Sequence, residues 1–221
     1  MSLVDVCFIT YLNSENRVKL FVQTFESFIK NTNFDLVKSI TLVDDASPIP
    51  IISEISNLKY IRNEKQSGVG FSKNLAIKQG DAKYIYLADT DVYFTENWLD
   101  KLLEAYEQNK HYFKLLGGGV HPYLQPRQGE DGIGITSHDA ISGWSWLLER
   151  KIWNKYGPLD SHAIGSGQSE DWAFCRKLVD DGYKVGCLKN QVISHCGITN
   201  VENKPCVGSE LFQRLPGVLY L

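Results

Sequence analysis

Segments typical of strands and segments typical of helices alternate along the first half of this chain, and this alternation limits the folds open to it. The strand-like segments are short and contain β-branched or aromatic residues, and they cover residues 4–10, 39–43, 59–62 and 84–88. The helix-like segments cover residues 18–30, 51–56, 68–79 and 96–108. Such an alternation predicts βαβ units and a mostly parallel sheet. Because ligands of these sheets bind beyond the carboxyl ends of the strands, the residues that follow each strand are candidates for a site.

The second half of the chain is less regular. Its pattern predicts a helix and several strands, which are residues 169–179 for the helix and 115–120, 141–148, 183–188 and 192–194 for the strands. Residues 121–139 are rich in Gly, Pro and polar types and are expected to form a long loop. Loops of this length in compact domains are usually functional or disordered, and we expect this one to border a ligand pocket or to close over it.

Composition favours one globular domain. The 221 residues are 43% hydrophobic and 22% charged, which is enough for one sizeable core. The net charge is −3 and no basic stripe indicates nucleic-acid binding, so phosphates on a partner must be held by something other than bulk charge, such as a bound cation. No apolar run of about 18 residues and no leader pattern is present, so neither a transmembrane segment nor a signal peptide is expected.

The cysteines and the tail bear on location. The five cysteines are odd in number and widely spaced, which argues against a secreted disulfide framework and favours a reducing, cytoplasmic setting. The tail at residues 198–221 ends in an apolar stretch, for which three alternatives are open: packing on the core, pairing with another subunit, or contact with a membrane surface. Packing on the core is the default, and peripheral membrane attachment is a secondary expectation.

Two carboxylates, Asp89 and Asp91, follow the apolar segment at residues 84–88. Both stay near the open end of a buried strand. Hard divalent cations such as Mn²⁺ and Mg²⁺ prefer oxygen ligands, and Mg²⁺ commonly takes one or two carboxylates together with substrate phosphates. A solvated turn in which an Asp caps the next helix is the alternative. The position directly after a strand of a βα unit favours the metal site.

Two further carboxylates, Glu170 and Asp171, begin the helix predicted at residues 169–179. Acids are common in first helical turns because the helix dipole stabilises them, so a purely structural role is one alternative. The other is catalytic: one carboxylate faces the cleft and removes the proton from an attacking hydroxyl group.

His195 follows the strand predicted at residues 192–194. It is either a structural hydrogen-bonding residue or a third metal ligand beside Asp91, and the pattern leaves both open. A zinc site is a separate alternative, and its ligands would be Cys187, His195, Cys196 and Cys206. Their spacings match no usual zinc pattern, which disfavours this alternative.

Three other motifs bear on function, and two of them have both a structural and a functional explanation. Asp44 and Asp45 follow the second strand-like segment, where they either bind a nucleobase or ribose or form an Asx-type turn. The helix that opens at Gly68 lacks the Gly-Lys-Ser/Thr ending of a Walker A loop, so nucleoside triphosphate hydrolysis is not supported. Trp144 and Trp146 alternate with small residues, so either one of them stacks on a sugar or both pack in the core.

Taken in order, these segments resemble the family 2 glycosyltransferases of the GT-A fold. The likeness covers about residues 4–197 and rests on five short motifs, which lie at residues 6–13, 42–47, 67–76, 84–92 and 169–177. The stretch from Gly143 to Gly197 is also similar to the family that adds N-acetylgalactosamine to polypeptides. Leu12 and Ala46 depart from the usual pattern, and no Gln-x-x-Arg-Trp-type motif of processive synthases is present.

The resemblance implies a fold and a set of site residues. The implied fold is a single α/β GT-A domain, an α/β/α sandwich with a mostly parallel nucleotide-binding sheet, in which about residues 4–110 bind the donor, 111–197 form the acceptor and catalytic half, and 198–221 form the tail. The implied donor-binding residues are Thr10, Tyr11, Asp45, Gly68, Lys73, Asn74 and Asp89, with Asp45 on uracil. The implied metal ligands are Asp91, Asp89 and His195. The implied catalytic base is Asp171, with Trp144 and Glu170 as secondary candidates for contact with acceptor or sugar.

The implied reaction moves a sugar from a nucleoside diphosphate donor, expected to be UDP-linked, to a hydroxyl group of a glycan, lipid-linked or other acceptor. It is expected to invert the anomeric carbon and to use Mn²⁺ or Mg²⁺, although similarity to a retaining family leaves retention open. One rival is a sugar-phosphate nucleotidyltransferase, which would need a Gly-rich basic loop after the first strand, and residues 12–17 contain no glycine. The other rival is a non-catalytic nucleotide- or sugar-binding protein, against which the acids at 89, 91 and 171 argue.

Overall fold

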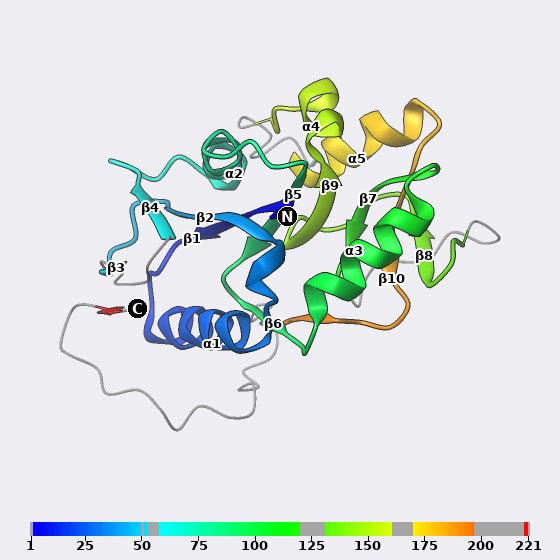
Figure 1. Cartoon of the computed structure of the whole chain (residues 1–221). Helices are drawn as coiled ribbons and strands as arrows, with labels where there is room; N and C mark the ends of the chain where they lie inside the picture. The colour runs from blue at the N-terminus through cyan, green and yellow to red at the C-terminus, as the bar shows by residue number, and fades with distance from the viewer. Residues whose placement is uncertain are drawn as a thin grey trace.

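In the part of the chain that the structure describes, a mixed sheet of eight strands lies at the centre of the computed structural model (Figure 1). The described residues are 2–49, 51–52, 58–119, 131–160, 170–196 and 219–220. The strand order is β4-β2-β1-β5-β9-β7-β10-β8. Helices cover both faces of this sheet, so the fold is the α/β sandwich that the sequence predicts.

Parallel strands form the first half of the sheet. They are β1 (Val4–Thr10), β2 (Val37–Asp44), β4 (Leu58–Arg62) and β5 (Tyr84–Asp89). Helix α1 (Glu15–Asn31) and the short 3₁₀ helix η1 (Phe34–Leu36) connect β1 to β2, and α2 (Val69–Ile77) connects β4 to β5. Every residue of β1 is buried because helices cover both of its faces, which explains its nearly continuous apolar run.

The second half of the sheet mixes strand directions. Its strands are β7 (Phe113–Gly117), β8 (Ile135–His138), β9 (Ser145–Glu149) and β10 (Lys184–Leu188). β9 runs antiparallel to β5 and β7, and β8 runs antiparallel to β10. The presence of β8 corrects the expected loop over residues 121–139, of which residues 121–130 lie outside the described part. β9 begins at Ser145, later than the strand expected at residues 141–148.

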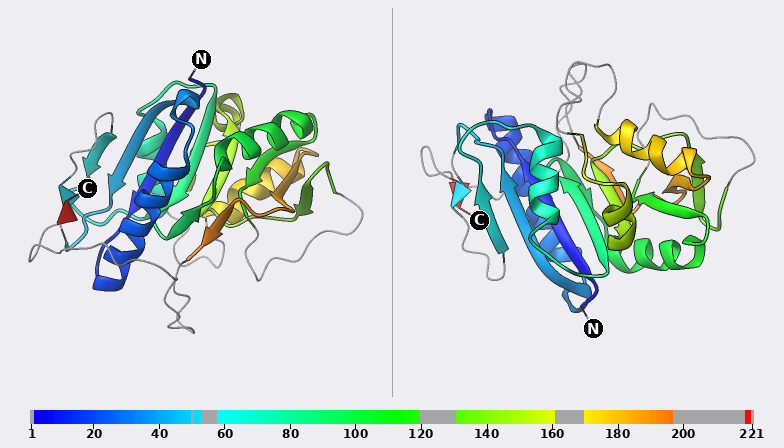
Figure 2. Two further views of the ribbon diagram at one scale, coloured as in Figure 1. Left: turned by 60° about the horizontal axis from the view of Figure 1, so that its bottom comes forward. Right: turned by 90° about the horizontal axis from the view of Figure 1, so that it is seen from above.

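Two helical layers enclose the sheet (Figure 2). α1 and α3 (Trp98–Asn109) pack against one face, and α2, α4 (Arg150–Tyr156) and α5 (Glu170–Asp180) pack against the other. Alternate residues of β1 point to the two layers, with Phe8 in the first and Cys7 in the second. Helix α4 is not predicted from the sequence because a helix of 7 residues is too short to show a clear period.

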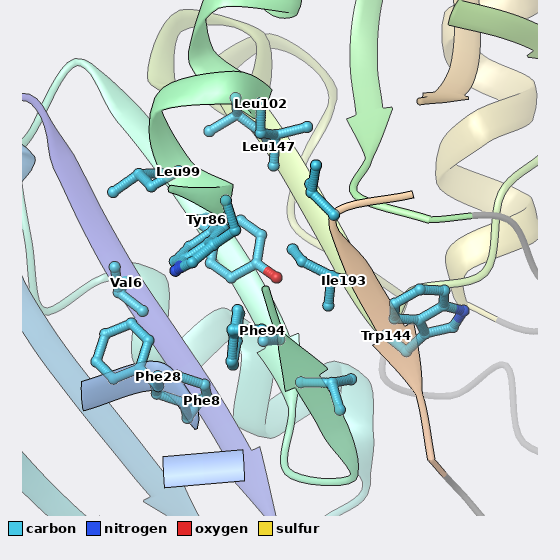
Figure 3. Close-up of a cluster of buried hydrophobic side chains, with 14 of the residues drawn as sticks. Val6, Phe8, Phe28, Tyr86, Phe94, Leu99, Leu102, Trp144, Leu147 and Ile193 are labelled. Atoms are coloured by element: carbon cyan, nitrogen blue, oxygen red, sulfur yellow. The ribbon is translucent and has the colours of Figure 1, made fainter. Parts of the chain in front are cut away.

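Aromatic side chains fill the layer between the sheet and helices α1 and α3 (Figure 3). The centroid of the Phe8 ring lies 5.0 Å from that of Phe28 and 6.2 Å from that of Phe94. The Phe94 ring lies 4.7 Å from the ring of Trp98. Each such pair adds about 0.5–1.5 kcal/mol beyond the burial of its surface. This layer fixes β6 (Val92–Phe94), the short strand that directly follows the second acid of the predicted metal motif.

A second, two-stranded sheet joins two distant parts of the chain. β6 pairs antiparallel with β11 (Ile193–His195), and His195 lies opposite Val92. The backbone N–H of Cys196 donates to the carbonyl oxygen of Asp91 at 2.7 Å. This pairing brings His195 beside Asp91.

The end of the tail contacts the same chain. β12 (Leu219–Tyr220) pairs in parallel with β3 (Ile51–Ile52). β3 corrects the helix expected at residues 51–56, whose residues 53–56 lie outside the described part. Within the described residues, none of the helices is both long enough and apolar enough to cross a membrane.

Candidate active site

The carboxyl ends of β1, β2 and β5 meet at one edge of the sheet. Thr10 pairs with Asp44 across β1 and β2, and Ile9 pairs with Asp89 across β1 and β5. The acids that end β2 and β5 are therefore brought to the same edge, as the parallel arrangement predicts. Asp91 lies just beyond the end of β5.

Asp91 is the more enclosed carboxylate of the predicted metal motif. Its side chain is 9% exposed, and its Oδ2 accepts a hydrogen bond from Nη1 of Arg17 at 2.7 Å. Its Oδ1 lies 3.4 Å from Nε2 of His195 and is buried, and it accepts no hydrogen bond from the residues that the structure describes. Such an oxygen is rare in a folded protein, and a bound cation is one way to satisfy it.

Asp91 and His195 shift each other's protonation. Burial raises the pKa of Asp91, but the close approach and positive charge of His195, together with the Arg17 guanidinium, outweigh burial and lower the pKa overall. Burial likewise lowers the pKa of His195, but Asp91 and then Asp89 outweigh it and raise the pKa overall. Asp91 is therefore ionised in the metal-free protein, and His195 keeps its proton to a higher pH than an exposed histidine.

Asp89 has a different environment, although it lies only two residues away. Its side chain is 34% exposed, and its Oδ1 lies 3.8 Å from Nζ of Lys73. The protein atoms around the carboxyl group remove hydration and raise its pKa to about 6, a rise that Lys73 opposes and Asp91 increases. Asp89 is the weaker acid of the two, and a cation bound nearby would favour its ionised form.

Lys73 is a buried cation at the centre of the site. Its Nζ donates to the carbonyl oxygen of Gly143 at 2.9 Å. The nearest carboxylate oxygens of Glu170 and Asp89 lie 3.5 Å and 3.8 Å from it, and the centroid of the Trp146 ring lies 5.8 Å away. A buried ammonium group raises the free energy of the folded state unless anions or carbonyl groups surround it. The partners of Lys73 supply this compensation, and they link α2 to the end of β5 and the start of α5.

Asp171 contacts the other side of the Gly143 peptide. Its Oδ2 accepts from the backbone N–H of Gly143 at 2.9 Å, and its Oδ1 accepts from the backbone N–H of Trp172 at 2.7 Å. A Cβ atom at position 143 would lie 2.6 Å from Nζ of Lys73 and 3.3 Å from Cβ of Asp171, so a side chain would not fit without movement. Sequence reasoning did not select Gly143. The available signal was a glycine inside a bulky strand-like segment, which often marks a close approach of the backbone.

Two tryptophans near the site differ in exposure. Trp144 is 4% exposed, its ring centroid lies 5.3 Å from that of His195, and it belongs to the buried cluster in Figure 3. It packs against His195, and its predicted contact with a sugar stays a prediction. Trp172, which the sequence predicts as a packing anchor of its helix, is instead 40% exposed; it directly follows Asp171 and offers an aromatic surface beside the candidate base.

Asp45 organises the loop on the predicted nucleotide side. Its Oδ1 accepts from Nδ2 of Asn63 at 2.7 Å and from the backbone N–H of Ser67 at 2.8 Å. Its Oδ2 accepts from the backbone N–H of Gly68 at 2.9 Å. Gly68 has a φ of +90°, which favours glycine, and it is the N-cap residue of α2. These contacts fix the shape of the loop, and the predicted contact between Asp45 and uracil stays a prediction.

The remaining donor-side residues lie in or near the same edge. Thr10 is buried, and its Oγ1 accepts a hydrogen bond from Oγ1 of Thr90 at 2.7 Å. Tyr11 directly follows β1 and is half-buried. The side-chain amide of Asn74 donates to the carbonyl oxygen of Leu159 and accepts from its backbone N–H, both at 2.9 Å. Thr10 and Asn74 thus have structural partners, and their contacts with a donor stay predictions.

Arg17 is the candidate that sequence reasoning missed most clearly. It lies in the first turn of α1, where Oγ of the N-cap Ser14 accepts a hydrogen bond from its backbone N–H at 3.3 Å. A basic residue in a first helical turn is unfavourable because the helix dipole stabilises acids there. That placement, just beyond β1, was the signal in the sequence.

A match to a known family decides the class of protein. Residues 6–166 match the family model described as Glycosyl transferase family 2. The chain belongs to glycosyl transferase family 2. The matched residues include Lys73, Asp89 and Asp91 but end before Asp171 and His195, so the roles of these last two depend on geometry and on resemblance.

Solved structures of glycosyltransferases share the fold of this family 2 domain. The structure of GalNAc-T7 with UDP, GalNAc and Mn²⁺ has a TM-score of 0.66 at 14% identity, over 88% of this chain and 44% of that one. The structure of the mannosyltransferase PcManGT from Pyrobaculum calidifontis with GDP-Man and Mn²⁺ has a TM-score of 0.59 at 12% identity, over 86% of this chain and 58% of that one. The chain therefore spans about half the length of these proteins. At such identities the likeness shows the GT-A fold.

The residues around Asp91 fit a divalent cation in this family 2 domain. A carboxylate oxygen and an imidazole nitrogen are both metal ligands, and Oδ1 of Asp91 is buried without a hydrogen-bond donor among the described residues. Among those residues, no group of three or more His, Cys, Asp or Glu is arranged to hold a metal ion. Asp91 and His195 would therefore share the cation with substrate phosphates and water, which is a common arrangement for Mg²⁺.

The zinc alternative finds less support. Cys187 belongs to the buried apolar cluster between the sheet and helices α2, α4 and α5, and among the described residues no group of three or more His, Cys, Asp or Glu is arranged to hold a metal ion. Another proposed ligand, Cys206, lies outside the described residues.

Proposed function

We propose that this domain transfers a sugar from a nucleoside diphosphate sugar, with UDP as the expected nucleotide, to a hydroxyl group of a glycan, lipid-linked or other acceptor. The observation that carries the proposal is the buried Asp91 carboxylate at the edge of the sheet, one oxygen of which accepts no hydrogen bond from the described residues. Membership of glycosyl transferase family 2 supports the transfer chemistry. The two similar structures contain different nucleotides, UDP and GDP-Man, so the choice of uracil depends on the resemblance around Asp45.

Asp91 and His195 would hold the divalent cation, Mn²⁺ or Mg²⁺, with Asp89 beside them. When bound, such a cation neutralises the negative charge that develops on a diphosphate leaving group. The enclosed position of Asp91 supports this role because fixed charges act more strongly where water is excluded.

Asp171 is the proposed general base of an inverting displacement. Two backbone N–H groups, from Gly143 and Trp172, fix the orientation of its carboxylate. The proton of the acceptor hydroxyl moves to Asp171 as the hydroxyl oxygen bonds to the anomeric carbon and the bond from that carbon to the diphosphate oxygen breaks. The neighbouring Glu170 lies 3.5 Å from Nζ of Lys73, and this ion pair makes it the less suitable base.

The proposed division of the chain follows the resemblance. About residues 4–110 serve the donor and about residues 111–197 serve the acceptor, with the segment at 121–139 bordering the acceptor pocket. A reducing, cytoplasmic setting is proposed from the odd number and wide spacing of the five cysteines. Peripheral attachment to a membrane through the 198–221 tail is a secondary proposal.

An assay of donor hydrolysis with and without Mn²⁺ separates this function from its rivals. A glycosyltransferase releases UDP slowly from a UDP-sugar in the presence of Mn²⁺, even without acceptor. A nucleotidyltransferase instead forms a nucleotide sugar and pyrophosphate from a nucleoside triphosphate and a sugar phosphate. A binding protein performs neither reaction, and absence of turnover across UDP- and GDP-sugars would contradict the proposal.

Substitution of the proposed base tests the catalytic assignment. Asp171→Asn is expected to reduce transfer by about 10²–10⁴-fold and to leave nucleotide affinity unchanged, because Asp171 takes no part in donor binding. Glu170→Gln is the matched control, and its loss of transfer should be smaller. Isothermal titration with UDP and Mn²⁺, alongside UDP release, measures both effects. Transfer by Asp171→Asn at the normal rate would show that the base is wrong.

A further inference from the structure

The proposed metal site already contains a cation, the guanidinium of Arg17. Its Nη1 donates to Oδ2 of Asp91 at 2.7 Å. The Arg17 side chain is 45% exposed while that of Asp91 is 9% exposed, so the arginine approaches the buried carboxylate from the solvent side. The donor diphosphate must approach the proposed cation from the solvent side as well.

A guanidinium and a divalent cation compete for the same carboxylate. Both are positively charged and would lie a few ångströms apart on Asp91, where like charges repel strongly because little water screens them. Arginine cannot lose its charge at ordinary pH, so it must move when the metal binds. The exposed part of its side chain leaves it room to move toward solvent.

We propose that Arg17 holds Asp91 in the metal-free state and transfers to the donor diphosphate when the divalent cation takes its place. A planar guanidinium binds phosphate oxygens through paired hydrogen bonds, and Arg17 in the first turn of α1 already reaches Asp91, the proposed metal ligand. This inference rests on the proposed function and adds to it a phosphate-binding residue from α1. In the free protein Arg17 satisfies one oxygen of a buried anion, and in the donor complex it neutralises part of the leaving group.

A second arginine–aspartate pair at the same sheet edge shows what a structural pair looks like. Arg62 donates to Oδ2 of Asp44, which also accepts from the hydroxyl group of Tyr60, while Oδ1 of Asp44 accepts from the backbone N–H of Ser47. Both oxygens of Asp44 are therefore satisfied. At Asp91 one oxygen accepts no hydrogen bond from the described residues, which is the arrangement expected of a carboxylate that awaits another ligand.

The test compares Arg17→Gln with Lys19→Gln in the full chain. Lys19 is an exposed residue of the same helix, so its substitution changes the net charge equally without altering the pair with Asp91. Binding of Mn²⁺ alone is measured by the loss of the free-ion electron paramagnetic resonance signal. Binding of UDP at saturating Mn²⁺ is measured by isothermal titration calorimetry, and thermal unfolding confirms that each variant folds.

Arg17→Gln is expected to raise the affinity for Mn²⁺ and to lower the affinity for UDP. Mn²⁺ binds about fivefold more tightly because its competitor is gone. UDP then binds about tenfold more weakly because a charged phosphate contact is lost. Arg17→Lys, which keeps the charge but not the paired donors, restores Mn²⁺ affinity toward the wild-type value and leaves UDP binding weakened. Lys19→Gln matches the wild type in both titrations.

Other outcomes would overturn either the inference about Arg17 alone or the proposed function as well, and the two cases can be told apart. A purely structural Arg17 predicts weaker Mn²⁺ binding in Arg17→Gln, and that outcome, or unchanged UDP affinity, overturns the inference while the proposed function stands. If the wild-type protein binds neither Mn²⁺ nor any nucleoside diphosphate, the proposed function fails and the inference fails with it.

Discussion

The two acidic clusters at the sheet edge look alike in sequence and differ in structure. At the end of β2, every carboxylate oxygen of Asp44 and Asp45 accepts at least one hydrogen bond from the protein; the donors are Ser47, Tyr60, Arg62, Asn63, Ser67 and Gly68. At the end of β5 and just beyond it, Asp89 and Asp91 face the cationic groups of Lys73, Arg17 and His195. One oxygen of Asp91 accepts no hydrogen bond from the described residues.

The two clusters therefore differ in what their charges can do. The carboxylates of Asp44 and Asp45 are satisfied within the protein, whereas one oxygen of Asp91 is available to a ligand. Backbone N–H groups donate to one oxygen of Asp44 and to both oxygens of Asp45, and such donors cannot leave, so these carboxylates shape loops. Side chains such as Arg17 can exchange partners, so the charge of Asp91 remains open to a metal ion. The following predictions test this contrast.

The largest effect is expected from Asp91→Ala. Loss of the proposed metal ligand should lower transfer by about a thousandfold or more, since the leaving group loses its counter-charge. Mn²⁺-dependent UDP binding should disappear in calorimetry. Retention of Mn²⁺ affinity in this variant would remove Asp91 from the metal site.

The matched substitution in the other cluster is Asp44→Asn. It should lower the free energy of unfolding by about 3 kcal/mol because it breaks a buried ion pair and leaves donors of the loop unsatisfied. Its affinity for Mn²⁺ in the absence of nucleotide should stay at the wild-type value. Urea unfolding measures the free energy of unfolding, and titration measures the Mn²⁺ affinity. A loss of Mn²⁺ affinity as large as that of Asp91→Ala would contradict the proposed difference between the two clusters.

Metal affinity should depend on pH through His195. Because Asp91 raises the pKa of His195 above its ordinary value of 6.5, a proton must leave before the ring binds a cation. Mn²⁺ affinity should therefore fall by up to about tenfold for each pH unit below the raised pKa. The protonated pair stabilises the metal-free fold in full below pH 6.5, and this stabilisation is lost as the pH rises through the raised pKa. Titration of His195→Asn should show a flatter pH profile, and an unchanged slope would exclude His195 as a ligand.

The smallest expected effects are changes in the free energy of unfolding, and they should have opposite signs in the two clusters. Asp89 has a pKa of about 6 against an ordinary 3.8, so its ionisation opposes folding as the pH rises through this window. Asp89→Asn should therefore stabilise the metal-free protein at neutral pH by about 1 kcal/mol after allowance for solvent screening. Asp45→Asn should destabilise it by about 1 kcal/mol or more because three N–H donors lose a carboxylate. Shifts of the same sign in thermal unfolding would contradict this account.

The parts of the fold that sequence predicts well are those whose signal is local. The buried runs of β1 and β5 and the apolar periodicity of α1 are visible in short windows, and they fix the sheet edge where Asp89 ends its strand. β8 lies in a segment of polar composition, and its assignment depends on pairing with β10, which no local pattern records.

The site residues also divide into those that a local sequence pattern predicts and those that depend on contacts between distant parts of the chain. The acids at 89 and 91 are predictable because they follow a recognisable strand. The approach of His195 to Asp91 depends on the pairing of β6 with β11, so the sequence pattern leaves it as one of two alternatives and only the resemblance favours it. The roles of Arg17 and Gly143 depend on single contacts across the fold, with Asp91 in one case and with Asp171 and Lys73 in the other.

The central claim is that Asp91 provides the charge that holds a divalent cation against the donor diphosphate. The most direct measurement is the anomalous scattering of manganese in crystals grown with UDP and Mn²⁺. The account predicts one strong manganese peak within bonding distance of an Asp91 oxygen and of a diphosphate oxygen. A manganese ion bound elsewhere, or a diphosphate held without any metal at Asp91, would contradict it.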